Sequence, residues 1–128
     1  MNTPNDRKYS KEHEWVLLQD DGTALIGISD FAQDQLGDVV FIDLPAQSSQ
    51  VTQSKQMGEI ESVKAVSDLF SPVSGAVVEV NGKVIDAPQL VNTDPYNSGW
   101  LVRVRLADIT ELDRLLNATQ YGALTAEG

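Results

Sequence analysis

Lys64 is the residue whose type and setting most readily support chemistry. It lies in the segment Glu61-Ser-Val-Lys-Ala-Val-Ser67, where a run typical of β-structure is interrupted by one lysine and resumes at once. Neither glycine nor proline stands at the break, and the pattern predicts a hairpin that presents the lysine amine at its tip. An amine presented in this way suits covalent modification, although an isolated turn lysine is by default a solvated residue.

Other reactive side chains are scarce. The chain has no cysteine and one histidine, so the sequence supports neither a thiolate nucleophile, nor a disulfide, nor a clustered metal site. No Gly-x-Ser-x-Gly elbow accompanies any serine, and we interpret His13 as a structural or surface residue rather than a catalyst. The sequence therefore favours a non-catalytic carrier that uses the reactivity of an attached cofactor.

The net charge of the chain indicates which classes of partner it can bind. The 128 residues carry a formal net charge of −10, which opposes binding to nucleic acid and to anionic membranes. Protein partners with basic patches are the better expectation. No apolar run approaches the roughly 20 residues of a membrane span, and residues 1–7 resemble neither a secretory signal nor a transit peptide. We expect a bacterial cytoplasmic protein, or a mitochondrial matrix protein if the chain is a processed organellar one.

Short β-like runs separated by turn residues dominate the chain. Strands are predicted at residues 14–18, 23–28, 39–44, 57–63, 66–70, 75–80 and 100–106. The first two form a hairpin around Asp20-Asp21-Gly22, the third reads as a buried strand stopped by Pro45, and Asn81-Gly82 reads as a tight turn.

Two helical regions are predicted. Ser29 or Asp30 can cap a short helix that runs to residue 35 or 36 and ends at Gly37. Near the C-terminus, Asp108 or Thr110 can cap a second helix, and Asn117 can start a further one. An apolar face of this tail, which should pack on the sheet, consists of Leu112, Leu115 and Leu116.

Residues 58–75, Gly-Glu-Ile-Glu-Ser-Val-Lys-Ala-Val-Ser-Asp-Leu-Phe-Ser-Pro-Val-Ser-Gly, resemble the lipoyl attachment site of the glycine cleavage system H protein family. The resemblance extends from about Lys8 to Leu124 through a series of ordered motifs. These are Lys8-Tyr9, His13-Glu-Trp-Val16, Gly27-Ile-Ser-Asp-Phe-Ala-Gln33, Leu36-Gly-Asp-Val-Val-Phe41, Leu44-Pro45, Pro88-x-Leu-Val-Asn92, Asp94-Pro-Tyr96 and Gly99-Trp-Leu101.

The resemblance implies a mainly β fold, a flattened barrel-sandwich hybrid like lipoyl and biotinyl carrier domains, with a short internal helix and C-terminal helices. It implies one domain over residues 1–128 and lipoate in amide linkage to Lys64. The implied function is to carry the aminomethyl group of glycine between enzymes. The implied partners are glycine decarboxylase, the folate-dependent aminomethyltransferase, dihydrolipoyl dehydrogenase, and a lipoate ligase or octanoyltransferase.

A carrier of this kind needs a cleft that protects the loaded arm. A cationic amine favours carboxylate partners, and an apolar arm needs an apolar wall. Asp68 is close to Lys64 in sequence and Glu14 lies in the His-Glu-Trp motif, so we name both as candidate ligands of the amine. For either residue, the interpretation as an ordinary solvated surface carboxylate is at least as good as that of a ligand.

Two other classes of protein remain open. One is a lipoyl or biotinyl domain serving a larger enzyme such as a 2-oxoacid dehydrogenase, and the other is an unmodified binding module or a carrier that relays lipoate. Biotin carriers place methionines around the lysine, and dehydrogenase lipoyl domains usually place an acidic residue before it. Here Val63 and Ala65 flank Lys64, which favours the H protein family.

Overall fold

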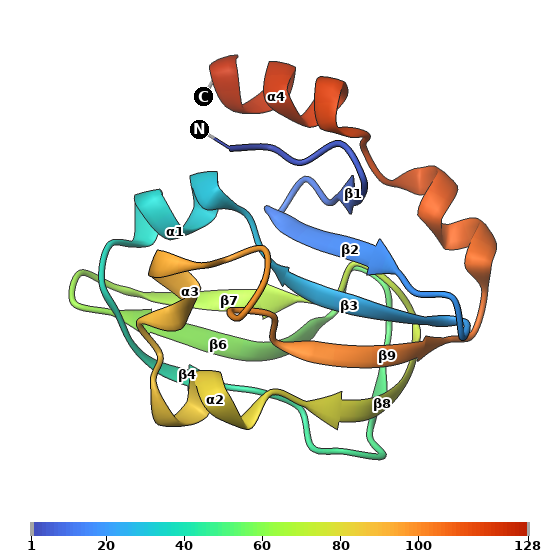
Figure 1. Ribbon diagram of the computed structural model, residues 1–128, viewed down its shortest axis with the longest axis horizontal. Helices are drawn as coiled ribbons and strands as arrows, with labels where there is room; N and C mark the ends of the chain where they lie inside the picture. Colours follow the sequence, from blue (N-terminus) through green and yellow to red (C-terminus); the bar gives the residue numbers. More distant parts are fainter. Residues whose placement is uncertain (1, 128) are drawn as a thin grey trace.

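The computed structural model describes residues 2–127, which form two antiparallel sheets surrounded by short helices (Figure 1). The six-stranded sheet has the order β1-β2-β3-β9-β8-β5, and the three-stranded sheet has the order β4-β6-β7. The strands are β1 (Lys8–Tyr9), β2 (Glu14–Leu18), β3 (Thr23–Ile28), β4 (Val39–Asp43), β5 (Gln50–Val51), β6 (Gln56–Ser62), β7 (Val66–Phe70), β8 (Gly75–Val80) and β9 (Val102–Leu106). The helices are α1 (Asp30–Leu36), α2 (Gly82–Asp86), α3 (Leu90–Thr93), the 3-10 helix η1 (Ile109–Arg114) and α4 (Ala118–Glu127).

Three groups of buried side chains hold these elements together. One packs inside the six-stranded sheet, a second joins the three-stranded sheet to α1, α2 and α3, and a third is aromatic. Leu44 and Met57 pack against both of the first two groups, so the core is continuous. Ile60 and Leu69 belong to the second group, and their burial fixes the register of the β6–β7 hairpin.

The strand predicted at residues 39–44 is present as β4, but it is not buried throughout. Val40 and Phe41 are 50% and 56% exposed. A register shift lies between Val39 and Phe41 where β4 pairs with β6. Such a bulge breaks the strict alternation of inward and outward side chains, which explains why the apolar run misled the sequence reading.

The predicted helix after β3 is confirmed as α1, with both of its expected ends. Ser29 is the N-cap, and its hydroxyl accepts from the N–H of Ala32 at 3.1 Å. Gly37 follows the last residue with φ 77°, the left-handed conformation that glycine adopts at least cost.

The tight turn predicted at Asn81-Gly82 is wrong, because Asn81 caps α2 instead. Its Oδ1 accepts from the N–H of Lys83 at 3.1 Å, while its Nδ2 donates to the carbonyls of Ser98 and Trp100. Both α2 and the unpredicted α3 are short, and each buries a valine, Val84 or Val91, in the core. Contacts distant in sequence thus decide the structure here.

The C-terminal region contains both expected helices, although the first is a 3-10 helix. Asp108 caps η1 by accepting from the N–H of Thr110 at 3.0 Å, and Asn117 accepts from the N–H of Gln120 at the start of α4. The ring of Tyr121 on α4 stacks on Tyr9 with centroids 4.6 Å apart, which fixes α4 beside β1. The three leucines predicted to pack on the sheet are partly buried against the core.

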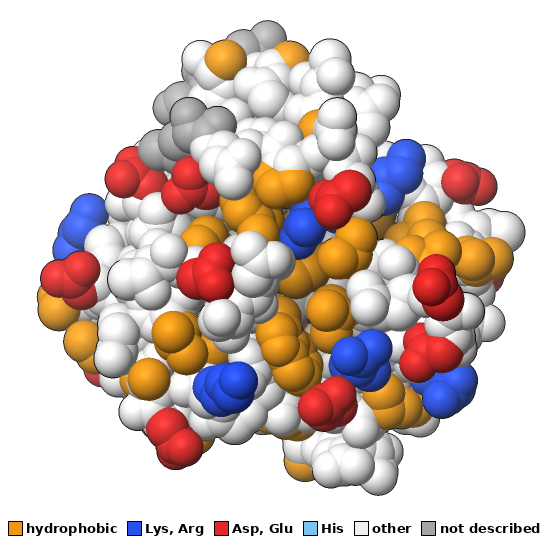
Figure 2. All heavy atoms as spheres, viewed as in Figure 1, with side chains coloured by type: hydrophobic (Ala, Val, Ile, Leu, Met, Phe, Trp, Pro, Cys, Tyr) orange, Lys and Arg blue, Asp and Glu red, His pale blue; other side chains and the backbone are white. Residues whose placement is uncertain are grey.

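Acidic side chains are spread over the face seen in Figure 2 rather than gathered in one patch, with apolar side chains between them. Within residues 2–127, no helix is both long and apolar enough to cross a bilayer.

Candidate functional site

Lys64 lies at the tip of the β6–β7 hairpin, and Ser62 determines the shape of the turn. The N–H of Ser62 donates to the carbonyl of Ala65 at 2.8 Å. The Ser62 side chain is buried, and its Oγ accepts from the backbone N–H groups of Lys64 (3.1 Å) and Ala65 (3.2 Å). One hydroxyl therefore satisfies two turn N–H groups without a glycine, and the Lys64 side chain is left exposed.

The hairpin tip is fixed to the end of α1. The N–H of Val63 donates to the carbonyl of Asp38 at 3.0 Å, and Nζ of Lys64 donates to the carbonyl of Gln35 at 3.3 Å. The lysine side chain crosses Gly37, where a Cβ would lie 2.8 Å from Cε of Lys64. The amine is thereby directed along α1.

A cavity of about 450 Å³ lies between α1 and the edge strand β7, beside this lysine. Its apolar wall consists of Ile28, Phe31, Ala32, Leu36, Ile60, Ala65, Val66 and Leu69. Its polar lining consists of Glu12, His13, Glu14, Gln35, Ser67 and Asp68. A mainly apolar cleft with a few polar groups suits an aliphatic chain that ends in a polar group.

Glu14 is the buried acid of this cavity and is only 2% exposed. The Ser10 hydroxyl donates to its Oε1 at 2.6 Å, and the N–H of Phe70 donates to its Oε2 at 3.4 Å. Burial raises the pKa of Glu14 to about 8, against the opposing effect of these two hydrogen bonds. The carboxyl is therefore mostly protonated at neutral pH, which avoids an unpaired buried charge.

Asp68 borders the same cavity in a different setting. It is exposed, and its Oδ1 accepts from Nε2 of Gln56 on the neighbouring strand at 3.0 Å. Along β7, Leu69 faces the core and Asp68 alternates to the other side, so Asp68 lies at the rim. The structure thus brings Glu14 and Asp68 to one cavity, as the sequence reading expected, but only Glu14 is enclosed.

His13 supports the cavity wall. Its backbone has φ 75°, its Nδ1 lies 2.8 Å from the hydroxyl of Tyr121, and its ring packs against Phe31 with centroids 5.0 Å apart. Burial lowers the pKa of His13, which favours the neutral imidazole. The Tyr121 hydroxyl also lies 2.6 Å from Oγ of Ser29, so α4 is linked through one hydroxyl to both the cavity wall and the start of α1.

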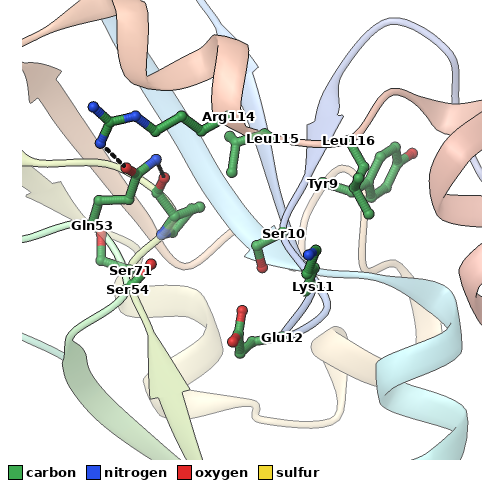
Figure 3. Close-up of a pocket in the computed structure, with 11 residues that line it drawn as sticks. Tyr9, Ser10, Lys11, Glu12, Gln53, Ser54, Ser71, Arg114, Leu115 and Leu116 are labelled. Carbon is green, nitrogen blue, oxygen red and sulfur yellow. Dashed lines mark hydrogen bonds between the residues drawn. The ribbon is translucent and has the colours of Figure 1, made fainter.

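A second cavity, of about 350 Å³, lies on the other side of Ser10 (Figure 3). Its described lining is largely polar and includes Lys11, Gln53 and Arg114, with Nη1 of Arg114 donating to Oε1 of Gln53 at 3.3 Å. No described residue of the lysine hairpin lines it. Of these two cavities, the one beside β7 is lined by residues of the lysine hairpin.

Residues 2–127 contain no cluster of three or more His, Asp or Glu side chains that could hold a metal ion.

A lysine at a hairpin tip, on two open antiparallel sheets, defines a carrier of the lipoyl type with a barrel-sandwich fold. A crystal structure of a glycine cleavage system H protein from Mycobacterium marinum superposes with a TM-score of 0.90 at 39% identity, covering 96% of this chain and 98% of that one. The fold predicted from the sequence is confirmed by this likeness.

The chain belongs to the glycine cleavage H-protein family, whose sequence profile matches residues 7–128. A glycine cleavage system H protein of Symbiobacterium thermophilum is 52% identical over 127 residues, covering 99% of this chain and 98% of the relative. One from Carboxydothermus hydrogenoformans is 52% identical over 124 residues, covering 97% and 95%. Members of this family are the lipoyl carrier subunits of the glycine cleavage system, and the resemblance noted in the sequence is confirmed.

The raised pKa of Glu14 predicts a characteristic pH dependence of stability. Folding moves this pKa from an ordinary 4.5 to about 8, so between these values the unfolded chain has lost a proton that the folded chain retains. Glu14 then lowers the free energy of unfolding as pH rises, by up to about 1.4 kcal/mol per pH unit. Glu14→Gln should remove this decline, which urea unfolding between pH 5 and 8 would measure.

The matched control is Glu59→Gln, which removes one exposed carboxylate from β6. If the stability curves of the two variants had the same shape between pH 5 and 8, Glu14 would not be the buried acid described above.

Proposed function

We propose that this chain carries lipoate on Lys64 and transports the aminomethyl group of glycine from the decarboxylase to the folate-dependent aminomethyltransferase. The observation that carries the proposal is the exposed lysine beside an apolar cavity whose lining includes a buried carboxyl group. Lipoate supplies the disulfide that accepts and releases the group. The chain itself supplies the attachment point and the protected cavity, and we infer that it catalyses no step.

The site fits an acylated lysine arm in size and in character. Lys64 is exposed to a modifying enzyme, and the neighbouring Val63, Ala65 and Val66 are exposed as well. The cavity offers an apolar wall for a hydrocarbon chain, and Gln35 belongs both to the lysine's hydrogen bond and to the cavity lining. An arm on Lys64 thus starts at the cavity that would hold its end.

Glu14 is suited to hold a cationic amine at that end. Its carboxyl is mostly neutral at pH 7 because burial disfavours the charge. An ammonium group in the cavity would supply the opposite charge, favour ionisation of Glu14, and send the displaced proton to solvent. Asp68, at the rim, would add a weaker and more screened attraction.

Four partners follow from this role: the decarboxylase, the aminomethyltransferase, dihydrolipoyl dehydrogenase, and a lipoate ligase or octanoyltransferase. The net charge of −10 favours encounter with basic surfaces on these proteins, through a long-range attraction that salt screens. The relatives described above are bacterial, which supports a role for this protein in the bacterial cytoplasm. We infer that its residues form one carrier domain.

The attachment site predicts the outcome of one substitution. Of the five lysines, only Lys64 should gain the lipoyl mass when the chain is produced with lipoate and a ligase, and Lys64→Arg should gain none. Lys83→Arg, on α2, is the matched control and should be modified normally. Intact mass spectrometry measures both, and a lipoyl mass on Lys64→Arg would contradict the site.

The same proteins test the carrier role. Lipoylated wild-type chain should restore glycine cleavage when mixed with the other three components, and Lys64→Arg should not. A lipoylated chain that gave no glycine cleavage would favour a lipoate relay, or service to 2-oxoacid dehydrogenases, instead.

Protection of the cargo predicts separate effects for the two carboxylates. Glu14→Gln cannot ionise and should hasten loss of the aminomethyl group from the isolated loaded protein roughly tenfold, as expected for one charge-assisted hydrogen bond. Asp68→Asn, at the exposed rim, should change the lifetime only about two- to fivefold. Glu59→Gln controls for net charge. Unchanged lifetimes in both test variants, with lipoylation intact, would contradict a role for either carboxylate in holding the amine.

A further inference from the structure

Asn92 does not line the cavity between α1 and β7. Its side chain nevertheless fixes the segment after α1 that the side chain of Lys64 crosses. Its Nδ2 donates to the carbonyl of Gly37 at 2.8 Å and to Oε1 of Gln33 at 3.1 Å. Its Oδ1 accepts from the N–H of Val39 at 2.9 Å. One amide thus fixes both sides of the chain reversal that follows α1.

The bond to Val39 has a consequence for α1. In a continuing helix, the N–H of Val39 would donate to the carbonyl four residues earlier, which is that of Gln35. The helix ends at Gly37, so the N–H of Val39 pairs with Asn92 and the Gln35 carbonyl accepts from Nζ of Lys64 at 3.3 Å. The side chain of Lys64 reaches this acceptor across Gly37, where the missing Cβ leaves room for it.

We propose that Asn92 is a positioning residue for the arm: by bonding Gly37 and Val39, it holds the chain reversal after α1 in the form that leaves the Gln35 carbonyl available to Nζ of Lys64 before and after acylation. Acylation removes the charge of Nζ but leaves one N–H on the same atom. The donor required by Gln35 is therefore present in the lipoyl amide as well.

This contact would fix the first part of the arm along α1, toward a cavity that Gln35 itself helps to line. Less conformational freedom then has to be lost when the loaded end enters the cavity. The inference rests on the proposed lipoylation of Lys64, and the experiment separates the two.

Hydrogen exchange of the lipoyl amide tests the contact. In lipoylated protein labelled with ¹⁵N at lysine Nζ, only an acylated Nζ carries an amide proton, so Lys64 gives one amide signal. Its exchange should be roughly fivefold slower than that of free lipoyl-lysine amide, as expected for one net hydrogen bond. A signal that exchanges at the free rate would overturn this inference alone, whereas the absence of any amide signal would overturn the lipoylation proposal with it.

Two substitutions test the role of Asn92. Asn92→Ala removes all three bonds that hold the reversal after α1, so exchange should rise toward the free rate while the lipoyl mass is unchanged. Asn92→Asp retains an oxygen for Val39 but sets its second oxygen against the Gly37 carbonyl and Oε1 of Gln33, so it should raise the exchange rate as well. The exposed Asn97, replaced by alanine, is the matched control. Protection that persists in Asn92→Ala would contradict the assignment.

Discussion

The contact between the lysine hairpin and the end of α1 is the interaction on which the site depends. In the proposed role, Lys64 must be exposed to a modifying enzyme, and the arm that it carries must have a shelter for its cargo. The bond from Val63 to the carbonyl of Asp38 places the exposed tip directly against α1. Because α1 and β7 together form the cavity, the same contact sets the distance between the attachment point and the shelter.

Burial of Glu14 lowers the stability of the fold at pH values where the unfolded chain would ionise this carboxyl group. A carboxyl group enclosed next to Ile28 and Leu69 costs folding free energy whenever the pH would ionise it in the unfolded chain. Ser10 and Phe70 satisfy its oxygens without supplying a countercharge. None of the ion pairs in residues 2–127 involves Glu14, so in the proposed role a cationic cargo would supply the countercharge.

Local signals in the sequence predicted much of the fold. The β2–β3 and β6–β7 hairpins and α1 follow from alternation, caps and turn residues that are close together in the chain. The same reasoning failed at Asn81-Gly82, because a tight turn and a helix cap favour the same residue types, and the choice depends on bonds to Ser98 and Trp100. The two-residue strands β1 and β5 are too short to leave a pattern.

For the site, Lys64 and its hairpin could be predicted from one motif. The convergence of Glu14 and Asp68 on one cavity depends on a contact between the two sheets, where the N–H of Phe70 donates to Glu14, and no local pattern reports it. Ser10 and Phe31 were not predicted, because a hydroxyl that bonds a buried acid and an aromatic ring that walls a cavity look like ordinary residues in sequence. The family resemblance indicated which two carboxylates to consider, and the structure showed which of them is enclosed.

We propose that the loaded end of the arm lies in the cavity between α1 and β7. Nuclear Overhauser effects from a ¹³C-labelled aminomethyl group, introduced enzymatically from labelled glycine, would measure its position in the lipoylated protein. We expect contacts with the side chains of Ile28, Phe31 and Leu69, which line the cavity. A labelled group that showed the averaged signals of a freely mobile arm, with no contact to these side chains, would contradict it.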